Sequence, residues 1–191
     1  MTAMTPSGLF IDHLEKSPTT PTLMTLATVG TDGYPRTRTV MVSGVGEDGR
    51  VSFHTDARSR KVRDIATCPK ASLTVLTPDR ERQVTVVGDV VPDTPTGERA
   101  AFARRSRYLQ LLAWLNDADL AAKTTEERRR LWAAFADEHP DLGSSGPPET
   151  WAGYAVVPRE YLFWTADAVG PSRRVRYSRA GGGWSREVLP G

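Results

Sequence analysis

Short runs in which β-branched and hydrophobic residues alternate with polar ones fill much of the first half of the chain. They cover residues 22–29, 37–42, 51–55, 71–76 and 83–91. Glycine, aspartate or charged clusters separate them, which is typical of strands joined by turns. Gly30–Gly33 lies between the first two runs, so we expect a hairpin there. Gly44–Arg50 and Asp79–Arg82 are expected to form two more turns.

Helical spacing dominates a different set of segments. These are residues 6–16, 58–66, 98–115 and 124–138. Thr124 and Glu127 have the spacing of a capping box, which predicts a helix start at that point. The last two segments follow one another after Pro95, so the helices are expected to be grouped along the chain.

The C-terminal part returns to strand patterns. Residues 141–150 predict a loop, and three β-like runs follow at 151–157, at 161–164, and at 174–178 with 184–189 across Gly181–Gly183. The strands are short, joined by turns and not interleaved with crossover helices. We therefore expect a mainly antiparallel β, α+β barrel with helices packed on one side. A single domain is expected over 1–191, comprising a barrel core (20–92), a helical segment (95–140) and C-terminal dimerisation strands (150–190).

Composition narrows the class of protein. The 191 residues are 39% hydrophobic and 25% charged, with a formal net charge of +2, so no strong field for nucleic acid is expected. Cys68 is the single cysteine, and no internal disulfide can form. No apolar run approaches the roughly 18 residues that span a bilayer, and no signal-peptide layout begins the chain. The expectation is a cytoplasmic protein that binds neither membrane nor nucleic acid.

Two motif classes are set aside. Residues 44–49 fit G-x-G-x-x-G, but a strand pattern follows them, whereas a dinucleotide fingerprint must open a helix. Glu47 and Asp48 would also repel a pyrophosphate. The three histidines, at positions 13, 54 and 139, are scattered, so no metal site is predicted.

Basic residues gather where the predicted strand 51–55 gives way to a helix. Arg58, Arg60, Lys61 and Arg63 lie at this helix start. A helix N-terminus favours anions, and cations there oppose the helix dipole unless a bound anion neutralises them. The segment thus indicates either a phosphate site or a solvated basic face.

Two further features are weaker by themselves. Arg36 and Arg38 alternate with threonines in a strand pattern, so they share one face, which points either into the barrel or to solvent. Gln83 enters a strand, where its amide could meet the edge of a heterocycle.

Taken in order, these segments resemble the pyridoxamine 5′-phosphate oxidase family. The similarity extends from about Thr22 to Leu189 through Arg38-Thr39-Val40-Met41-Val42, Val51-Ser52-Phe53-His54-Thr55, Ser59-Arg60-Lys61, Glu81-Arg82-Gln83-Val84, Trp151-Ala152-Gly153-Tyr154, Leu162-Phe163-Trp164 and Arg173-Arg174-Val175-Arg176-Tyr177. The resemblance implies a split β-barrel that binds FMN across a homodimer interface.

The resemblance also implies roles for individual residues. Arg38, Arg60 and Lys61 match positions that hold the phosphate, and Gln83 matches one that meets the flavin ring. Trp164 and Arg174 match positions supplied by the second subunit. The remaining matches to the cofactor-binding positions are Thr39, Val40, Met41, His54, Thr55 and Ser59.

The chain departs from the family at the substrate positions. Ser43 replaces a lysine that grips the substrate phosphate, and the middle-helix Tyr, Arg and Ser fall on Ala101, Arg105 and Leu109. Of these only Arg105 is kept. The family's Arg-Leu-His element before the flavin arginine falls on Gly170-Pro171-Ser172. One departure concerns the cofactor instead, since the family's Gln-Ser pair that touches FMN falls on Ala118-Asp119. Ser43, Arg105, Leu109 and Ser172 are therefore the candidate substrate residues, and recognition of pyridoxamine phosphate should be lost.

The leading hypothesis is an FMN-dependent oxidoreductase, most simply an oxidase. It would take a hydride from a small aromatic or dihydroaromatic molecule. No catalytic acid or base is identified. Three alternatives stay open. The chain could be a genuine pyridoxamine 5′-phosphate oxidase in which Arg104, Arg105 and Arg107 take the phosphate. It could be a split barrel that binds deazaflavin F420 or haem, or a flavin binder without turnover.

Overall fold

The computed structural model describes residues 4–16 and 21–191. Residues 1–3 and 17–20, which include the first residues of the predicted domain and of its barrel core, lie outside this description. The chain divides into two compact units, which are described separately below. The sheet unit holds the chain up to Phe53, Arg60–Pro92 and Tyr154–Gly191, and the helical unit holds His54–Ser59 and Asp93–Gly153.

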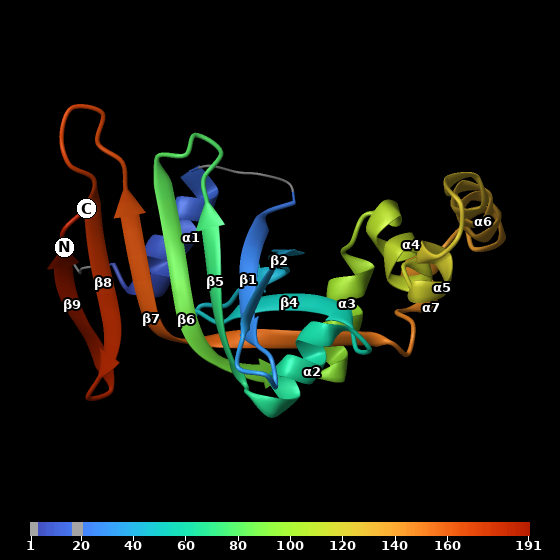
Figure 1. The fold of residues 1–191 in the computed structure, drawn as a ribbon, viewed down its shortest axis with the longest axis horizontal. Coiled ribbons are helices and arrows are strands. Elements are labelled where there is room, and N and C mark those ends of the chain that lie inside the picture. The colour runs from blue at the N-terminus through green and yellow to red at the C-terminus, as the bar shows by residue number, and fades with distance from the viewer. Residues whose placement is uncertain (1–3, 17–20) are drawn as a thin grey trace. The chain divides into compact units, whose positions relative to one another are not determined.

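One antiparallel sheet forms most of the sheet unit (Figure 1). Its strands are β1 (Leu23–Val29), β2 (Pro35–Met41), β3 (Gly44–Val45), β4 (Val51–Asp56), β5 (Lys70–Leu76), β6 (Arg82–Pro92), β7 (Trp151–Thr165), β8 (Arg173–Ala180) and β9 (Gly183–Leu189). Their order is β2-β1-β5-β6-β7-β4-β3, with β8 beside β7 and β9 beside β8. The predicted split barrel and its first hairpin, β1–β2, are confirmed.

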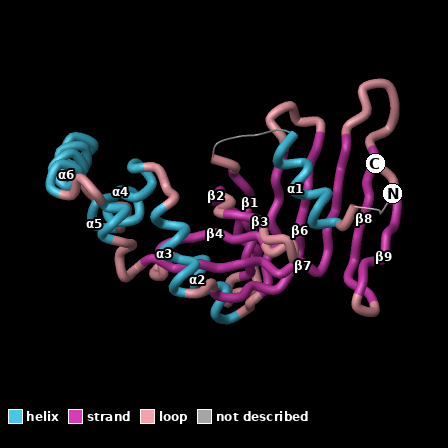
Figure 2. The backbone as a smooth tube through the Cα atoms, turned by 180° about the vertical axis from the view of Figure 1, so that it is seen from behind, coloured by secondary structure: helices cyan, strands magenta, loops and turns pink. Residues whose placement is uncertain are grey.

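The inner face of the sheet is its apolar core. Leu26, Leu73, Val86 and Tyr161 are directly opposite one another across β1, β5, β6 and β7, and all four are fully buried. Helix α1 (Pro6–Lys16) lies against this face in Figure 2 and inserts Phe10, whose ring centroid is 6.3 Å from that of Tyr161. Burial of each such side chain contributes about 1.5–3 kcal/mol, so the sheet and α1 fold as one core.

The turn before β4 contains the G-x-G-x-x-G segment, residues 44–49, which leads into a strand and not into a helix. Gly44–Val45 pairs with Val51–Ser52 as the two-residue strand β3, so the predicted turn 44–50 is shortened to 46–50, and the segment is a hairpin. Gly49 has φ +84°, and a Cβ there would lie 2.4 Å from the Tyr161 hydroxyl oxygen. That hydroxyl donates to the Gly49 carbonyl at 3.1 Å, and burial raises the pKa of Tyr161. Gly49 is therefore required for packing.

The helical unit has its own small core of Phe102, Leu111, Leu142 and Trp151. Its helices are α3 (Pro95–Ala103), α4 (Arg107–Leu115), α5 (Ala118–Ala121), α6 (Thr125–Glu138) and α7 (Leu142–Ser145). The predicted capping box at the start of α6 is confirmed, because the Thr124 and Glu127 side chains each accept from the other's backbone N–H.

Three expectations about element boundaries were wrong. The predicted helix 98–115 is two helices, because Ser106 caps a new start by accepting from the Leu109 N–H. The predicted loop 141–150 contains α7, which Asp141 caps. The runs 151–157 and 161–164 are one strand, since a bulge opposite Val87/Gly88 absorbs the extra residue beside Pro158. Within the described ranges, no helix has the length and hydropathy to cross a membrane.

Candidate cofactor and substrate sites

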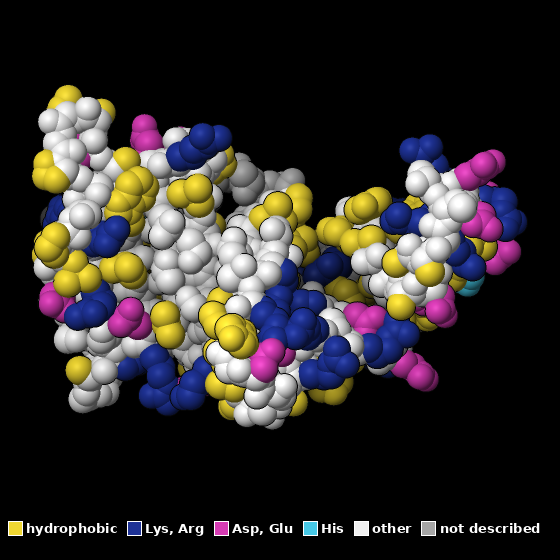
Figure 3. Space-filling model, in the orientation of Figure 1, with side chains coloured by type: hydrophobic (Ala, Val, Ile, Leu, Met, Phe, Trp, Pro, Cys, Tyr) yellow, Lys and Arg dark blue, Asp and Glu magenta, His cyan; other side chains and the backbone are white. Residues whose placement is uncertain are grey.

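A basic cavity of about 410 Å³ opens in the sheet unit beside helix α2 (Arg60–Thr67). Its lining residues are Thr31, Arg36, Arg60, Arg63 and Asp64. Thr31 is in the β1–β2 turn and Arg36 is on β2, so a hairpin and a helix form the cavity together. In Figure 3, Lys and Arg side chains gather in the region of α2. An oxyanion is the natural ligand for such a lining.

A polar triad, formed by the buried Thr28 and Asp64 and the half-buried Arg38, fixes α2 to the sheet. The Thr28 hydroxyl donates to Asp64 Oδ2 at 2.7 Å, and Arg38 Nη1 donates to the Thr28 Oγ1 at 2.7 Å. Arg38 Nη2 is 3.6 Å from Asp64 Oδ2. Burial lowers the pKa of Arg38, the Asp64 carboxylate opposes this effect, and the nearby Arg36 and Arg60 guanidiniums add to it. Arg38 therefore lies within electrostatic range of the cavity, but its charge is already shared with Asp64.

Three predicted cofactor-binding residues form a row on the outer face of the sheet. Gln83 on β6 is directly opposite Trp164 on β7, and Trp164 is directly opposite Arg174 on β8. Residues opposite each other in an antiparallel sheet project from the same face, so their side chains are neighbours. The Gln83 amide nitrogen is also 3.4 Å from the Thr85 hydroxyl. This row presents an amide, an indole and a guanidinium in sequence.

The predicted stretch Arg38–Met41 is divided between the two faces of β2. Arg38 and Val40 are opposite Leu26 and Met24, which belong to the inner face. Thr39 and Met41 project from the outer face instead, as strand alternation requires. Ser43 is half-buried just after β2, and its backbone N–H donates to the Ser52 carbonyl. The four side chains of this stretch therefore do not converge on one site.

His54 has a dry environment in the helical unit. Its ring stacks on Trp151 with centroids 5.1 Å apart, and Nε2 is 3.5 Å from Asp93 Oδ2. Burial, together with the Arg105 charge, lowers the pKa of His54 to about 4, although Asp93 acts in the opposite direction. A Cβ at Gly153 would lie 2.8 Å from Nε2, so glycine provides the space for the imidazole.

Arg105 has the clearest unmet hydrogen-bonding capacity. Its guanidinium carbon is 4.5 Å from the centre of the Trp151 ring. Nε and Nη2 are both buried and have no hydrogen-bond partner in the described part of the chain, and burial lowers the pKa of Arg105 to about 10. These two nitrogens form one edge of the planar fork, the edge that binds a carboxylate with two parallel bonds.

The other predicted residues are placed as follows. Leu109 is half-buried on α4, and Thr55 and Ser59 approach each other, with hydroxyl oxygens 3.4 Å apart. Lys61 is half-buried on α2, and Ser172 is half-buried in the sheet unit just before β8. Arg107 donates through Nη2 to the carbonyls of Ala136 and His139, so this arginine satisfies carbonyl groups at the C-terminal end of α6.

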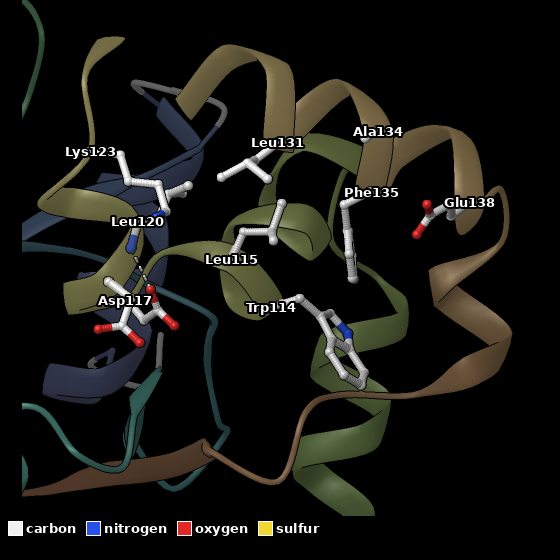
Figure 4. A pocket seen from close by; sticks show the side chains of 10 residues that line it. Trp114, Leu115, Asp117, Leu120, Lys123, Leu131, Ala134, Phe135 and Glu138 are labelled. Carbon is white, nitrogen blue, oxygen red and sulfur yellow. Dashed lines mark hydrogen bonds between the residues drawn. The ribbon is translucent and has the colours of Figure 1, made fainter. Parts of the chain in front are cut away.

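A second cavity, of about 340 Å³, lies in the helical unit (Figure 4). Trp114, Leu115, Leu131 and Phe135 form its apolar walls, and Asp117 and Glu138 lie at opposite ends in the view. It is lined by none of the predicted site residues, although the Ala118-Asp119 departure reaches it through Asp119. Its lining combines these apolar walls with three acidic residues and Lys123, in contrast to the basic cavity.

Sequence patterns missed some residues that matter in these sites. Arg63 belongs to the basic helix start but has no counterpart in the family pattern, and only its i, i+3 spacing from Arg60 hinted that both meet one cavity. Asp93 and Trp151 are far from His54 in sequence, and no local signal connects them.

Comparison with known proteins identifies the family of the chain. The model of the pyridoxamine 5′-phosphate oxidase family matches residues 10–138. A pyridoxine/pyridoxamine 5′-phosphate oxidase of Pseudomonas paraeruginosa is 34% identical over 179 residues, covering 92% of this chain and 80% of that protein. One of Nocardioides is 37% identical over 166 residues, covering 87% and 76%.

Solved structures share the fold. PhzG of Burkholderia lata, in complex with tetrahydrophenazine-1-carboxylic acid, superposes with a TM-score of 0.86 at 24% identity, over 100% of this chain and 94% of that one. An FMN-binding protein of Nostoc punctiforme related to pyridoxamine 5′-phosphate oxidase gives 0.78 at 23%, over 99% of each chain. From the family match and the identities to curated relatives, this chain belongs to the pyridoxamine 5′-phosphate oxidase family.

Proposed function

We propose that the protein is an FMN-dependent oxidoreductase that oxidises a small planar carboxylic acid rather than pyridoxamine phosphate. FMN, when bound, supplies an acceptor for a hydride at flavin N5. The observation that carries the proposal is the Arg105 fork, which is buried, cationic and without an acceptor in the described residues. In the family pattern it is the one substrate-phosphate contact that this chain keeps.

The cofactor half of the proposal is supported by the sheet unit. A cavity with arginines at its wall suits a phosphate, because charge-assisted hydrogen bonds to a phosphate are worth about 1.5–3 kcal/mol each. Arg60 and Lys61 would hold the phosphate, with Arg38 behind them. Gln83 would meet the ring of a flavin bound to its own subunit, and Trp164 and Arg174 that of a flavin bound to the second copy. The proposal therefore includes a homodimer.

The substrate half rests on the difference between a phosphate and a carboxylate. A phosphate dianion needs several donors around it, and Ser43, Ala101 and Leu109 replace three of the family's contacts. A carboxylate needs one fork with two parallel N–H groups, which Arg105 retains. His54 would stay neutral at pH 7, so it adds no second positive charge beside the fork.

The test begins with the purified protein. Its absorption spectrum and the mass of the molecule released on denaturation should identify FMN. Oxidation of dihydroaromatic carboxylic acids is then compared with oxidation of their carboxamides at equal flavin loading. We expect the acids to be preferred by about 10²-fold or more in kcat/KM, since the amide forfeits both charge-assisted bonds. Equal rates for acid and amide would refute the role of Arg105.

A second function, oxidation of pyridoxamine 5′-phosphate itself, is favoured by the names of the relatives at 34–37% identity. It requires new phosphate contacts near Arg105. Arg107 Nη2 already donates to two carbonyls, so the remaining donors are Arg107 Nη1, which is buried without a partner in the described residues, and the exposed Arg104. A kcat/KM for pyridoxamine phosphate above about 10⁴ M⁻¹s⁻¹, within the usual range for enzymes, would establish this function instead.

A further inference from the structure

The basic cavity contains an arginine whose function the family pattern does not explain. Arg63 is one turn after Arg60 on α2, and both line the cavity of about 410 Å³. Residues three apart are neighbours on a helix surface, and helical side chains lean toward the N-terminus. The two guanidiniums therefore approach the cavity from the same side.

The charges around this cavity are unequally compensated. Arg36 forms an ion pair with Asp32, and Arg38 shares Asp64 with Thr28. For Arg60 and Arg63, by contrast, no carboxylate lies within ion-pair distance anywhere in residues 4–16 or 21–191, and neither side chain has a hydrogen-bond acceptor there. Two like charges at i, i+3 repel each other. The cavity thus has an excess of two positive charges.

We propose that Arg63 holds the cofactor phosphate together with Arg60, and that Arg38 contributes less because Asp64 already shares its charge. This inference rests on the proposed function, since it takes the anion to be the terminal phosphate of FMN. A phosphate monoester carries roughly −1.5 to −2 at pH 7, which matches the excess. Arg38 is then a positioning residue, which with Thr28 and Asp64 fixes α2 on β1.

Binding of FMN and of riboflavin to the flavin-free protein separates these roles, because riboflavin lacks only the phosphate. Arg63→Gln and Arg60→Gln should each weaken FMN binding about tenfold or more, which is about 1.4 kcal/mol, and change the riboflavin Kd less than twofold. Arg38→Gln should weaken both flavins by similar factors and lower the unfolding temperature. Arg129→Gln, an exposed arginine on α6, is the matched control and should change nothing.

The outcomes are distinct. If Arg63→Gln leaves the FMN Kd within twofold while Arg60→Gln weakens it, or if Arg63→Gln weakens both flavins equally, the role of Arg63 is refuted and FMN binding stands. If the unmodified protein binds neither flavin, the proposed function itself fails. Inorganic phosphate that raises the apparent FMN Kd in the unmodified protein, but not in Arg63→Gln, supports the inference. If phosphate raises the apparent FMN Kd by the same factor in the unmodified protein and in Arg63→Gln, the role of Arg63 is contradicted.

Discussion

The two arginine sites of this protein differ in how water reaches them. Arg60 and Arg63 are exposed and line an open cavity of the sheet unit, whereas the fork of Arg105 is buried in the helical unit beside Trp151. Exposed charges are screened by solvent and salt, so each contributes modestly and several must act together. A buried charge without an acceptor destabilises the free protein, and a single ligand that pairs with this charge removes the whole penalty. The first arrangement suits a cofactor phosphate and the second suits selection of a substrate.

The largest expected effect comes from Arg105→Met, which keeps the volume and removes the fork. We expect kcat/KM for a carboxylic acid substrate to fall by about 10²–10³-fold, because two charge-assisted bonds are lost. The unfolding temperature should stay equal or rise, since a buried unpaired charge is removed. Kinetics and thermal unfolding check both. A variant that unfolds at lower temperature with unchanged kinetics would show that Arg105 is structural.

The second effect is the pH dependence of stability in the helical unit. The pKa of His54 is about 4 in the folded protein against an ordinary 6.5, with Asp93 and Arg105 nearby. The unfolded chain therefore takes up a proton first, so stability is complete above pH 6.5 and is lost as the pH falls toward 4. The loss is on the order of 3 kcal/mol.

His54→Phe should remove that loss and keep the stacking on Trp151. Denaturant unfolding at pH 7.5, 6, 5 and 4.5 measures the free energy of unfolding of both proteins. The free energy of unfolding of His54→Phe, relative to that of the unmodified protein, should increase as the pH falls. A constant difference across this range would contradict the buried neutral imidazole.

More of the structure could be predicted from the sequence in the sheet unit than in the helical unit. Alternation, turn glycines and the ordered family segments predicted the split barrel and its hairpins, because strand period and turn chemistry are local. The break between α3 and α4 was missed because the Ser106 cap lies in a run of arginines, which is also compatible with the polar face of one continuous helix. The surroundings of His54, formed by Asp93 and Trp151, could not be predicted, since they depend on tertiary contacts between distant segments. The sequence likewise could not show that Asp64 takes up the charge of Arg38.

The third prediction concerns that triad. Asp64→Asn should destabilise the protein by about 2 kcal/mol, because the charge facing Arg38 is lost while the amide still accepts from Thr28. Asp48→Asn is the matched control, since Asp48 pairs with Arg50 on the surface and such pairs contribute about 0–1 kcal/mol. Chemical denaturation of both variants is the measurement. Equal effects would show that the Arg38–Asp64 pair behaves as a surface pair.

The smallest effect, and the most direct contrast between exposed and buried arginines, is the response to salt. The screening length falls from about 10 Å at 0.1 M to about 3 Å at 1 M, so an anion held by exposed arginines loses affinity as salt rises. Raising NaCl from 0.05 to 0.5 M should weaken FMN binding severalfold and leave riboflavin binding within twofold. The KM for a carboxylic acid substrate at saturating FMN should change less than the FMN Kd, because solvent ions do not reach the Arg105 fork. If KM rises as steeply as the Kd for FMN, the two sites are equally open to water, and the distinction between a screened cofactor site and a dry substrate site fails.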